Sequence, residues 1–318
     1  MVLSIATLAL AQSFTATPLH TTSFKVISVA PGPGSTFLCS TEDSLIRVID
    51  AASGTTKATL KGHPQPAYGL AANRAGTLYA TGDETGRIWI WNAKGQKVRE
   101  FSRDRAHTRG IQFLSFSADG KKLASTGADD FIFQWNPATG QQLGKVAGDG
   151  NVVESGQYAG SAVFAASQVK GLFSYSGALA RTGAWGAHSN QGMQDLAVDP
   201  AGTRGVTAGR DGSIAFWNLT GKKKMSEAKG HEDVIMHVAM APNGSMAASS
   251  GVDGNVHFWS VGSGARVFSL GSQSSVGAPI CFTGNGAYFV SSSSSDTLTI
   301  YKLSKPQGAV TKGKSKRK

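Results

Sequence analysis

Short runs of alternating apolar and polar residues recur along the whole chain, and their period of two predicts β-strands. Residues 88–91 (Ile-Trp-Ile-Trp), 214–217 (Ile-Ala-Phe-Trp) and 256–259 (Val-His-Phe-Trp) are examples, each bounded by Gly and Asp. Polar turns that end in glycine, such as Ala118-Asp119-Gly120, separate pairs of apolar runs. Because glycine tolerates a positive φ, these turns favour tight hairpins, and we expect antiparallel strands throughout.

Two independent series of residues share one period. Seven glycines are spaced by 42, 44, 40, 42, 42 and 42 residues, and a large apolar or aromatic residue follows each of them after 15 positions. The glycines are Gly34, Gly76, Gly120, Gly160, Gly202, Gly244 and Gly286; the followers are Ile49, Trp91, Trp135, Tyr175, Trp217, Trp259 and Tyr301. A unit of roughly 42 residues with room for four strands is typical of one blade of a β-propeller.

The length of the chain agrees with a single ring of such units. Neither a charge block nor a Pro-rich linker divides its 318 residues, of which 40% are hydrophobic. In a propeller every blade buries its faces against two neighbours, so one domain of this size can be stable. We therefore predict an all-β, seven-bladed propeller of four-stranded antiparallel blades over residues 12–304.

A third series is polar. Ten positions before the Trp lies a hydroxyl residue, six positions before it lies an Asp, and a His lies earlier still. Three repeats carry the complete set, which we name the structural tetrads: His107, Ser125, Asp129 and Trp135; His188, Thr207, Asp211 and Trp217; His231, Ser249, Asp253 and Trp259.

These positions resemble the WD-repeat family, whose signature is a Gly-His near the start of each unit and a Trp-Asp near its end. The resemblance covers roughly residues 13–304. The terminal Asp is mostly replaced here, as in Trp91-Asn92 and Trp259-Ser260. The resemblance implies a propeller that acts as a rigid binding platform.

The tetrad residue types also match those of a hydrolase triad, so His107, Ser125 and Asp129 could be catalytic. Against this, the same trio recurs three times in step with a structural period. Indole, hydroxyl, imidazole and carboxylate groups can close a chain of satisfied hydrogen bonds. We therefore interpret the tetrads as structural and expect no enzyme activity.

Neither a metal nor a cofactor is expected. Five of the seven histidines occupy the repeat register one per blade, and His237 and His257 sit singly in predicted strands. A zinc site needs three or four clustered ligands. No phosphate-binding or dinucleotide-binding loop is present in the sequence.

The ring should close through the N-terminus. After Tyr301 only three residues precede Lys305-Pro306, which leaves no room for another strand. We therefore expect residues 13–17 to pair with the blade formed by residues 280–301, which would remove an exposed sheet edge.

The fourth unit departs from the pattern. It has Ala165, Val169 and Tyr175 where its neighbours have the hydroxyl, the Asp and the Trp. Two interpretations are open: sequence drift compensated by apolar packing, or a partner site that includes the off-register Trp185.

The two ends of the chain suggest roles of their own. The formal charge is +11, and five of the last seven residues are basic. We predict that residues 305–318 form a disordered basic tail, which either stays solvated or binds an anionic polymer such as nucleic acid or an envelope glycan. Lys222-Lys223-Lys224 has no interleaved aromatics, so nucleic acid is the less favoured partner.

Residues 1–11 form an uncharged apolar run that ends in Ala9-Leu10-Ala11. This resembles a signal peptide and would place the protein in the periplasm or outside the cell, although no basic residue precedes the run. An extra strand or a cytoplasmic chain is the alternative. No stretch is long enough to span a membrane. Cys39 and Cys281 lie in strands of different blades and are expected to be free, buried thiols.

The predicted function is a monomeric, non-catalytic scaffold that binds a protein or peptide on its loop face. The alternative is an exported or surface-associated propeller that binds an anionic polymer through its tail. The candidate partner-binding residues lie just before the turn Asp, or its equivalent, and a few positions after each His: Lys25, Glu42, Tyr68, Glu84, Gln112, Met193, Arg210 and Met236.

Overall fold

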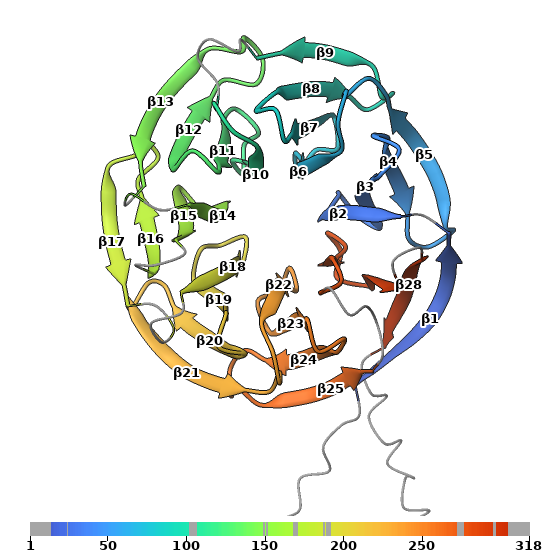
Figure 1. Ribbon diagram of the computed structural model, residues 1–318, viewed down its shortest axis with the longest axis vertical. Coiled ribbons are helices and arrows are strands. Elements are labelled where there is room, and N and C mark those ends of the chain that lie inside the picture. The colour runs from blue at the N-terminus through green and yellow to red at the C-terminus, as the bar shows by residue number, and fades with distance from the viewer. Residues whose placement is uncertain are drawn as a thin grey trace, which may run out of the picture.

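The computed structural model describes residues 14–23, 25–101, 107–148, 150, 152–167, 171–186, 188, 192–271, 277–294 and 297–304. The candidate signal peptide, the basic tail and Val169 lie outside these ranges. Within them the chain forms seven four-stranded sheets arranged as a ring around a central axis (Figure 1). The predicted seven-bladed, all-β architecture is confirmed.

The strands follow one another in chain order. Blade 1 contains β2 (Val26–Pro31), β3 (Thr36–Thr41), β4 (Ile46–Asp50) and β5 (Thr55–Leu60). Blade 2 contains β6 (Ala67–Ala72), β7 (Leu78–Asp83), β8 (Ile88–Asn92) and β9 (Lys97–Glu100). Blade 3 contains β10 (Ile111–Phe116), β11 (Leu123–Gly127), β12 (Phe131–Trp135) and β13 (Gln142–Ala147). Blade 4 contains β14 (Val153–Ala159), β15 (Ala162–Ser167), β16 (Gly171–Tyr175) and β17 (Arg181–Trp185).

The remaining blades repeat this arrangement. Blade 5 contains β18 (Met193–Val198), β19 (Arg204–Gly209), β20 (Ser213–Asn218) and β21 (Lys223–Lys229). Blade 6 contains β22 (Ile235–Met240), β23 (Met246–Gly251), β24 (Val256–Ser260) and β25 (Arg266–Leu270). Blade 7 contains β26 (Ile280–Phe282), β27 (Tyr288–Ser294), β28 (Thr297–Ser304) and the N-terminal β1 (Thr15–Thr22).

Strand β1 closes the ring, as predicted. It pairs antiparallel with β28, from Thr15 opposite Ser304 to Thr22 opposite Leu298, and it is longer than the predicted segment. The two ends of the chain thus meet in one sheet, where β1 becomes the outermost strand of blade 7 (Figure 1).

The periodic glycines lie in the turns between the first two strands of each blade. All seven adopt positive φ angles between +58° and +70°. Residues with a Cβ are disfavoured in this region, so the backbone of a repeated tight turn explains the glycine series.

The core consists of apolar clusters between neighbouring blades. In one of them, Ile90 of blade 2 packs with Leu114 and Trp135 of blade 3. Trp91, Trp135 and Trp259 are at most 2% exposed. Because each blade is covered on both faces, the residues of the third strand are buried whichever way they point, which explains runs such as residues 88–91.

β-bulges recur on both the innermost and the outermost strands. On the innermost strand of blades 1 to 6, one residue interrupts the pairing register: Ile27, Tyr68, Gln112, Glu154, Gln194 and Met236. On the outermost strands the interrupting residues are Leu19, Lys57, Val98, Leu143, Thr182, Met225 and Val267. All six exposed large hydrophobic residues of the described chain occupy such bulges: Leu19, Tyr68, Val98, Leu143, Met225 and Val267.

Candidate functional site

The structure brings together two of the three tetrads as a continuous chain of polar contacts. In blade 3, His107 Nδ1 lies 2.7 Å from Asp129 Oδ1 and His107 Nε2 lies 2.8 Å from Ser125 Oγ. The indole N–H of Trp135 donates to the same hydroxyl over 2.9 Å.

Blade 6 repeats this arrangement. His231 Nδ1 lies 2.9 Å from Asp253 Oδ1, and His231 Nε2 lies 2.8 Å from Ser249 Oγ. Trp259 donates to Ser249 Oγ over 2.8 Å. The shared hydroxyl thus joins the third strand of the blade to the loop that carries the histidine.

Blade 2 holds a fourth chain, which the sequence rule missed. His63 contacts Thr81 Oγ1 at 2.6 Å and Asp83 Oδ2 at 2.9 Å, and Trp91 donates to Thr81 Oγ1 over 2.7 Å. The carboxylate comes from the last residue of β7, eight positions before the Trp, whereas the rule looked six positions before it, where Thr85 stands. A search for Asp at either offset would have found it.

The tetrad predicted for blade 5 requires a correction. His188 contacts Thr207 Oγ1 at 2.8 Å and Trp217 donates to that hydroxyl, but Asp211 Oδ1 lies 4.0 Å from His188 Nδ1. The hydroxyl of Ser213 fills the gap, 2.7 Å from His188 Nδ1, and donates to Asp211 Oδ1 over 2.6 Å. The Ser213 hydroxyl therefore lies between His188 and Asp211, and Asp211 is connected to the histidine only through this hydroxyl.

The donors set the direction of each chain. An indole nitrogen can only donate, so the hydroxyl accepts from the Trp and has its own hydrogen available for His Nε2. The histidine then carries its hydrogen on Nδ1 and donates it to the carboxylate, or in blade 5 to Ser213. Every polar group is paired, and no hydroxyl is left to attack a substrate. Ser125 and Ser249 are also at most 1% exposed.

Burial and hydrogen bonding oppose each other at the tetrad carboxylates. Burial raises the pKa of Asp83, Asp129 and Asp253, but the hydrogen bonds from their histidines and from backbone N–H groups outweigh it, so each pKa lies below its ordinary value. Burial lowers the pKa of His188 and His231 against the opposing pull of nearby carboxylates. Neutral imidazole beside ionised carboxylate is therefore the favoured state in blade 6.

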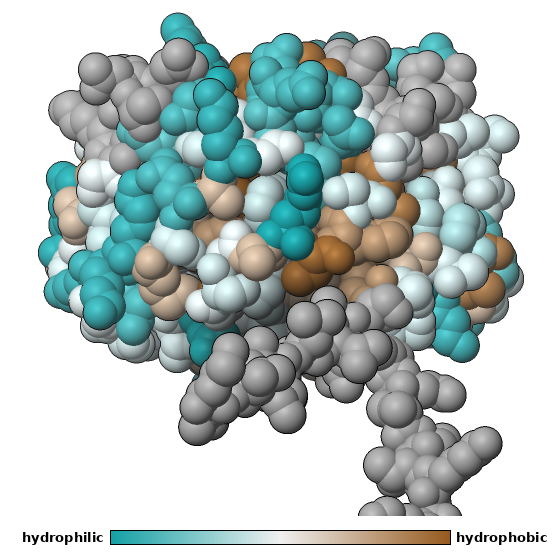
Figure 2. All heavy atoms as spheres, turned by 90° about the horizontal axis from the view of Figure 1, so that it is seen from below, coloured by the Kyte–Doolittle hydropathy of each residue, from teal (hydrophilic) through white to brown (hydrophobic). Residues whose placement is uncertain are grey.

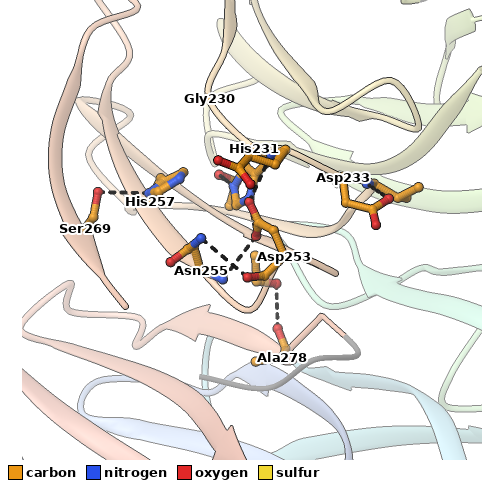
Figure 3. A network of polar contacts seen from close by, with 12 residues as sticks. Gly230, His231, Asp233, Asp253, Asn255, His257, Ser269 and Ala278 are labelled. Atoms are coloured by element: carbon orange, nitrogen blue, oxygen red, sulfur yellow. Dashed lines mark hydrogen bonds and ion pairs between the residues drawn. The ribbon is translucent and has the colours of Figure 1, made fainter. Parts of the chain in front are cut away.

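From the sequence we expected His257 to lie alone in its strand, but the structure places it beside a second histidine. Its ring packs against that of His231 with centroids 4.4 Å apart, and its Nδ1 lies 2.9 Å from Ser269 Oγ (Figure 3). His257 Nε2 faces the Arg266 guanidinium at 3.5 Å. Burial is the main cause that lowers the pKa of His257 to about 4, and the nearby His231 and Arg266 further disfavour a proton on this ring.

Among the residues that the structure describes, two groups of His and carboxylate residues have ligand-type atoms within 4.8 Å of one another: His231, Asp253 and His257; and His188, Asp211 and Glu227. In the first group, both nitrogens of His231 are engaged by Asp253 and Ser249, and the Arg266 guanidinium donates to His257 Nε2 over 3.5 Å. In the second, Lys224 Nζ lies 2.7 Å from Glu227. Protein cations and hydrogen-bond partners already neutralise these groups, so neither is arranged as an open metal site.

A channel of about 910 Å³ runs along the axis of the ring. Its lining extends from the start of the innermost strands, beside the histidine loops, to the turns at Gly34 and Gly284. All six bulge residues of the innermost strands line it, together with Pro279 of blade 7. We call these seven residues the channel mouth: Ile27, Tyr68, Gln112, Glu154, Gln194, Met236 and Pro279.

The channel mouth has a polar side and an apolar side. Gln112, Glu154 and Gln194 come from the consecutive blades 3 to 5, whereas Pro279, Ile27 and Tyr68 come from blades 7, 1 and 2. Deeper on the polar side, Asp195 accepts from the backbone N–H of Val238 over 2.9 Å, and burial raises its pKa to about 6.

Arg210 ties the polar side together. Its Nε donates to Gln194 Oε1 over 2.9 Å, and its guanidinium lies 3.7 Å from Glu154. The guanidinium thus bridges two blades at the channel mouth.

The candidate partner-binding residues divide into three groups. Tyr68, Gln112 and Met236 belong to the channel mouth, and Arg210 contacts it. Lys25, Glu42 and Glu84 are exposed on nearby loops, where Lys25 and Glu42 form an ion pair of 3.4 Å.

Met193 was predicted wrongly, because it is fully buried. It precedes the bulge of β18, and Gln194 occupies the place expected for it. Counting from the histidine fails here because the loops before the innermost strands differ in length.

Blade 4 has apolar packing where the tetrad would be. Ala165 and Phe173 lie opposite each other and belong to a buried cluster with Tyr175. Trp185 is 7% exposed and packs against Phe164, so its side chain belongs to the core and not to an exposed surface. A partner site on the edge or loops of blade 4 stays a prediction. Cys39 and Cys281 are free and buried, and burial raises the pKa of both thiols.

No helix in the described part of the chain has the length and apolar character needed to cross a membrane.

Comparison with known proteins matches three of the repeats to a family model. The family model described as "WD domain, G-beta repeat" matches residues 54–92, 95–136 and 222–260. A segment of 109 residues is 29% identical to Intraflagellar transport protein 122 homolog of Homo sapiens and covers 34% of this chain and 8% of that protein. Topless-related protein 1 of Arabidopsis thaliana is 29% identical over 107 residues, or 31% of this chain and 9% of the relative.

A longer match is to pre-mRNA-splicing factor cwf17 of Schizosaccharomyces pombe, which is 24% identical over 167 residues, 51% of this chain and 48% of the relative. The chain thus spans less than a tenth of the first two relatives and about half of the third. Each family match ends one residue beyond the buried Trp of a blade. Three of the repeats match this family model, and the seven four-stranded blades are consistent with a WD-repeat β-propeller.

Proposed function

We propose that this propeller is a non-catalytic platform that binds a segment of a protein or peptide at the channel mouth. The observation that carries the proposal is the repeated bulge of the innermost strands, which turns one side chain from each of six blades toward the channel. Bulges are enriched where a strand must aim a side chain at a functional site.

The chemistry of the channel mouth favours a mixed ligand. Tyr68 is 42% exposed although its neighbours Ala67 and Leu70 are at most 5% exposed. Exposed aromatic and Met side chains beside polar groups are typical of binding surfaces. A bound segment would place apolar side chains against Ile27 and Tyr68 and polar groups against Gln112 and Gln194.

A non-catalytic role is supported by the polar chains. The histidines of blades 2, 3, 5 and 6 are fully engaged with hydroxyl and carboxyl groups of their own blades. A general base must reach a substrate proton, and these imidazoles are buried.

Selection from a displayed random-peptide library tests the proposal. Peptides that bind the full-length protein should lose at least tenfold in affinity to a Tyr68→Ala, Met236→Ala variant. A Val98→Ala, Leu143→Ala variant is the matched control, because it removes two exposed apolar side chains on bulges of the outermost strands. Peptides that bind both variants equally would contradict a site at the channel mouth.

Export of the protein, with residues 1–11 as a cleaved signal peptide, and polymer binding by residues 305–318 are separate proposals supported by the sequence alone. N-terminal sequencing of the mature protein tests the first, because retention of Met1 would contradict cleavage.

A further inference from the structure

The outermost strands are basic, whereas the rest of the described chain is not. Strands β1, β5, β9, β13, β17, β21 and β25 form the circumference of the ring (Figure 1). They carry nine Lys or Arg residues and two Asp or Glu residues, whereas the remaining described residues carry thirteen and fifteen. The edge-on view in Figure 2 shows one side of the ring, where hydrophilic side chains lie beside pale and hydrophobic ones.

Part of this charge has a structural explanation. Lysine on an edge strand discourages pairing with other sheets. Lys97, Lys145 and Arg181 also lie over the rings of Trp89, Phe131 and Phe173, at 3.8, 3.6 and 4.0 Å from the centroids. Protection of the edge and contact with an aromatic ring need about one cation per blade. The outermost strand of blade 5 carries three lysines.

The excess lies along β21 of blade 5 and at the junction of that strand with blade 4. We call this cluster the basic sector: Arg181, Lys222, Lys223, Lys224 and Lys229, all of which are exposed. Lys222 Nζ donates to the backbone carbonyl of Thr182 over 3.0 Å, which brings the two blades together at this point. Glu227 is the only acidic residue on the two strands and pairs with Lys224 at 2.7 Å.

The backbone at Lys222 is an independent observation. Its φ is +49°, in the left-handed region that disfavours a Cβ. At the corresponding turn, blades 1, 2, 3 and 6 have Gly54, Gly95, Gly140 and Gly264, with φ between +70° and +79°. Blade 4 has Leu179 at this turn, with φ +59°, and that side chain is buried in the core. Of the two residues that carry a Cβ at this turn, Lys222 is thus the exposed one, and strained positions of this kind cluster at functional sites.

We propose that the basic sector binds a linear polymer of phosphate groups, at a surface separate from the channel mouth. The lysines of β21 line one extended strand, and Lys222 to Lys229 spans about 23 Å at ~3.3 Å per residue. A phosphate chain presents charges in a row and releases condensed counterions when it binds, so it needs no pocket. The convex rim does not match a flat bilayer.

Binding of fluorescently labelled inorganic polyphosphate and of a single-stranded oligonucleotide to the full-length protein tests the proposal. Raising the salt concentration from 50 to 200 mM should weaken binding by roughly a hundredfold if five phosphates are contacted. Lys223→Glu with Lys229→Glu should lower affinity at least tenfold. The matched control, Lys121→Glu with Lys302→Glu, changes the net charge equally at a turn of blade 3 and on β28 of blade 7, outside the basic sector, and should alter affinity less than threefold.

Binding of either polymer supports the proposal if it weakens with salt and with the Lys223→Glu, Lys229→Glu change as described. The polymer that binds more tightly identifies the source of the phosphates. Equal losses in the two charge-reversed variants would overturn it, as would loss of binding on removal of residues 305–318 alone. Equally tight binding of poly-glutamate would overturn the choice of phosphate. Thermal unfolding of each variant confirms that it is folded.

Discussion

The indole nitrogen of Trp135 lies 2.9 Å from the hydroxyl oxygen of Ser125, and this contact sets the hydrogen-bond direction of the whole chain in blade 3. Because the indole can only donate, the Ser125 hydroxyl accepts from Trp135 and donates its own hydrogen to His107. His107 in turn donates to Asp129. The residue types of a hydrolase triad are thus used to connect strands.

Replacing the shared hydroxyl should therefore destabilise the ring. Ser125→Ala leaves two buried groups, the Trp135 N–H and His107 Nε2, without partners, at about 1–3 kcal/mol each. We expect the free energy of unfolding to fall by about 2–4 kcal/mol in urea titrations. The exposed Ser263→Ala should change it by less than about 0.5 kcal/mol. Equal effects of the two substitutions would argue against a buried polar chain.

The ring-closing strand gives a second prediction. Deletion of residues 13–20 removes most of β1 and exposes the edge of β28. We expect a lower melting temperature for the whole domain in circular dichroism, with aggregation through the open edge. A circularly permuted chain that carries residues 13–22 after residue 304 should recover stability. Unchanged melting after the deletion would refute closure by this strand.

The buried histidines predict the pH dependence of stability. Folding lowers the pKa of His188 and His231, and that of His257 to about 4, while an unfolded histidine titrates near 6.5. Below about pH 6.5 the unfolded chain therefore binds protons that the folded chain does not. The free energy of unfolding should fall as pH drops, by up to about 1.4 kcal/mol per pH unit for each histidine. Urea titrations from pH 8 to pH 5 would show this, and a flat profile would contradict it.

Lys222 predicts a trade-off between stability and binding. Lys222→Gly relieves the left-handed backbone and should raise the free energy of unfolding by about 0.5–1 kcal/mol. The same change removes a charge from the basic sector and should weaken polyphosphate binding. Lys223→Gly is the control, because its backbone is extended in β21 and glycine should destabilise it. If Lys222→Gly lowers stability, the strain argument fails.

The sequence predicted the architecture because both repeated signals have simple physical causes. The glycine series follows from a positive φ in one turn, and the Trp series follows from burial between blades. The carboxylate was harder to place, because it only has to reach His Nδ1. Asp83 does so from the end of a strand, Asp129 from a turn, and Asp211 only through Ser213.

The candidate binding residues were harder to locate from the sequence, because their position depends on the local backbone geometry of the strand. A bulge changes which side of a strand faces the channel, and no residue type marks it in the sequence. Counting from the histidine selected Tyr68, Gln112 and Met236, which line the channel mouth, but chose Met193 in place of Gln194. Partner binding by these residues stays a prediction.

A double-mutant cycle on Ser249 and Trp259 tests the central claim that the polar chains hold the propeller together. The two residues lie 2.8 Å apart between hydroxyl and indole nitrogen, in a blade with a complete chain. Ser249→Ala, Trp259→Phe and the double variant should give a coupling free energy of at least about 1 kcal/mol in urea unfolding. Additive effects, with no coupling beyond about 0.3 kcal/mol, would show that the shared hydrogen bond does not stabilise the blade.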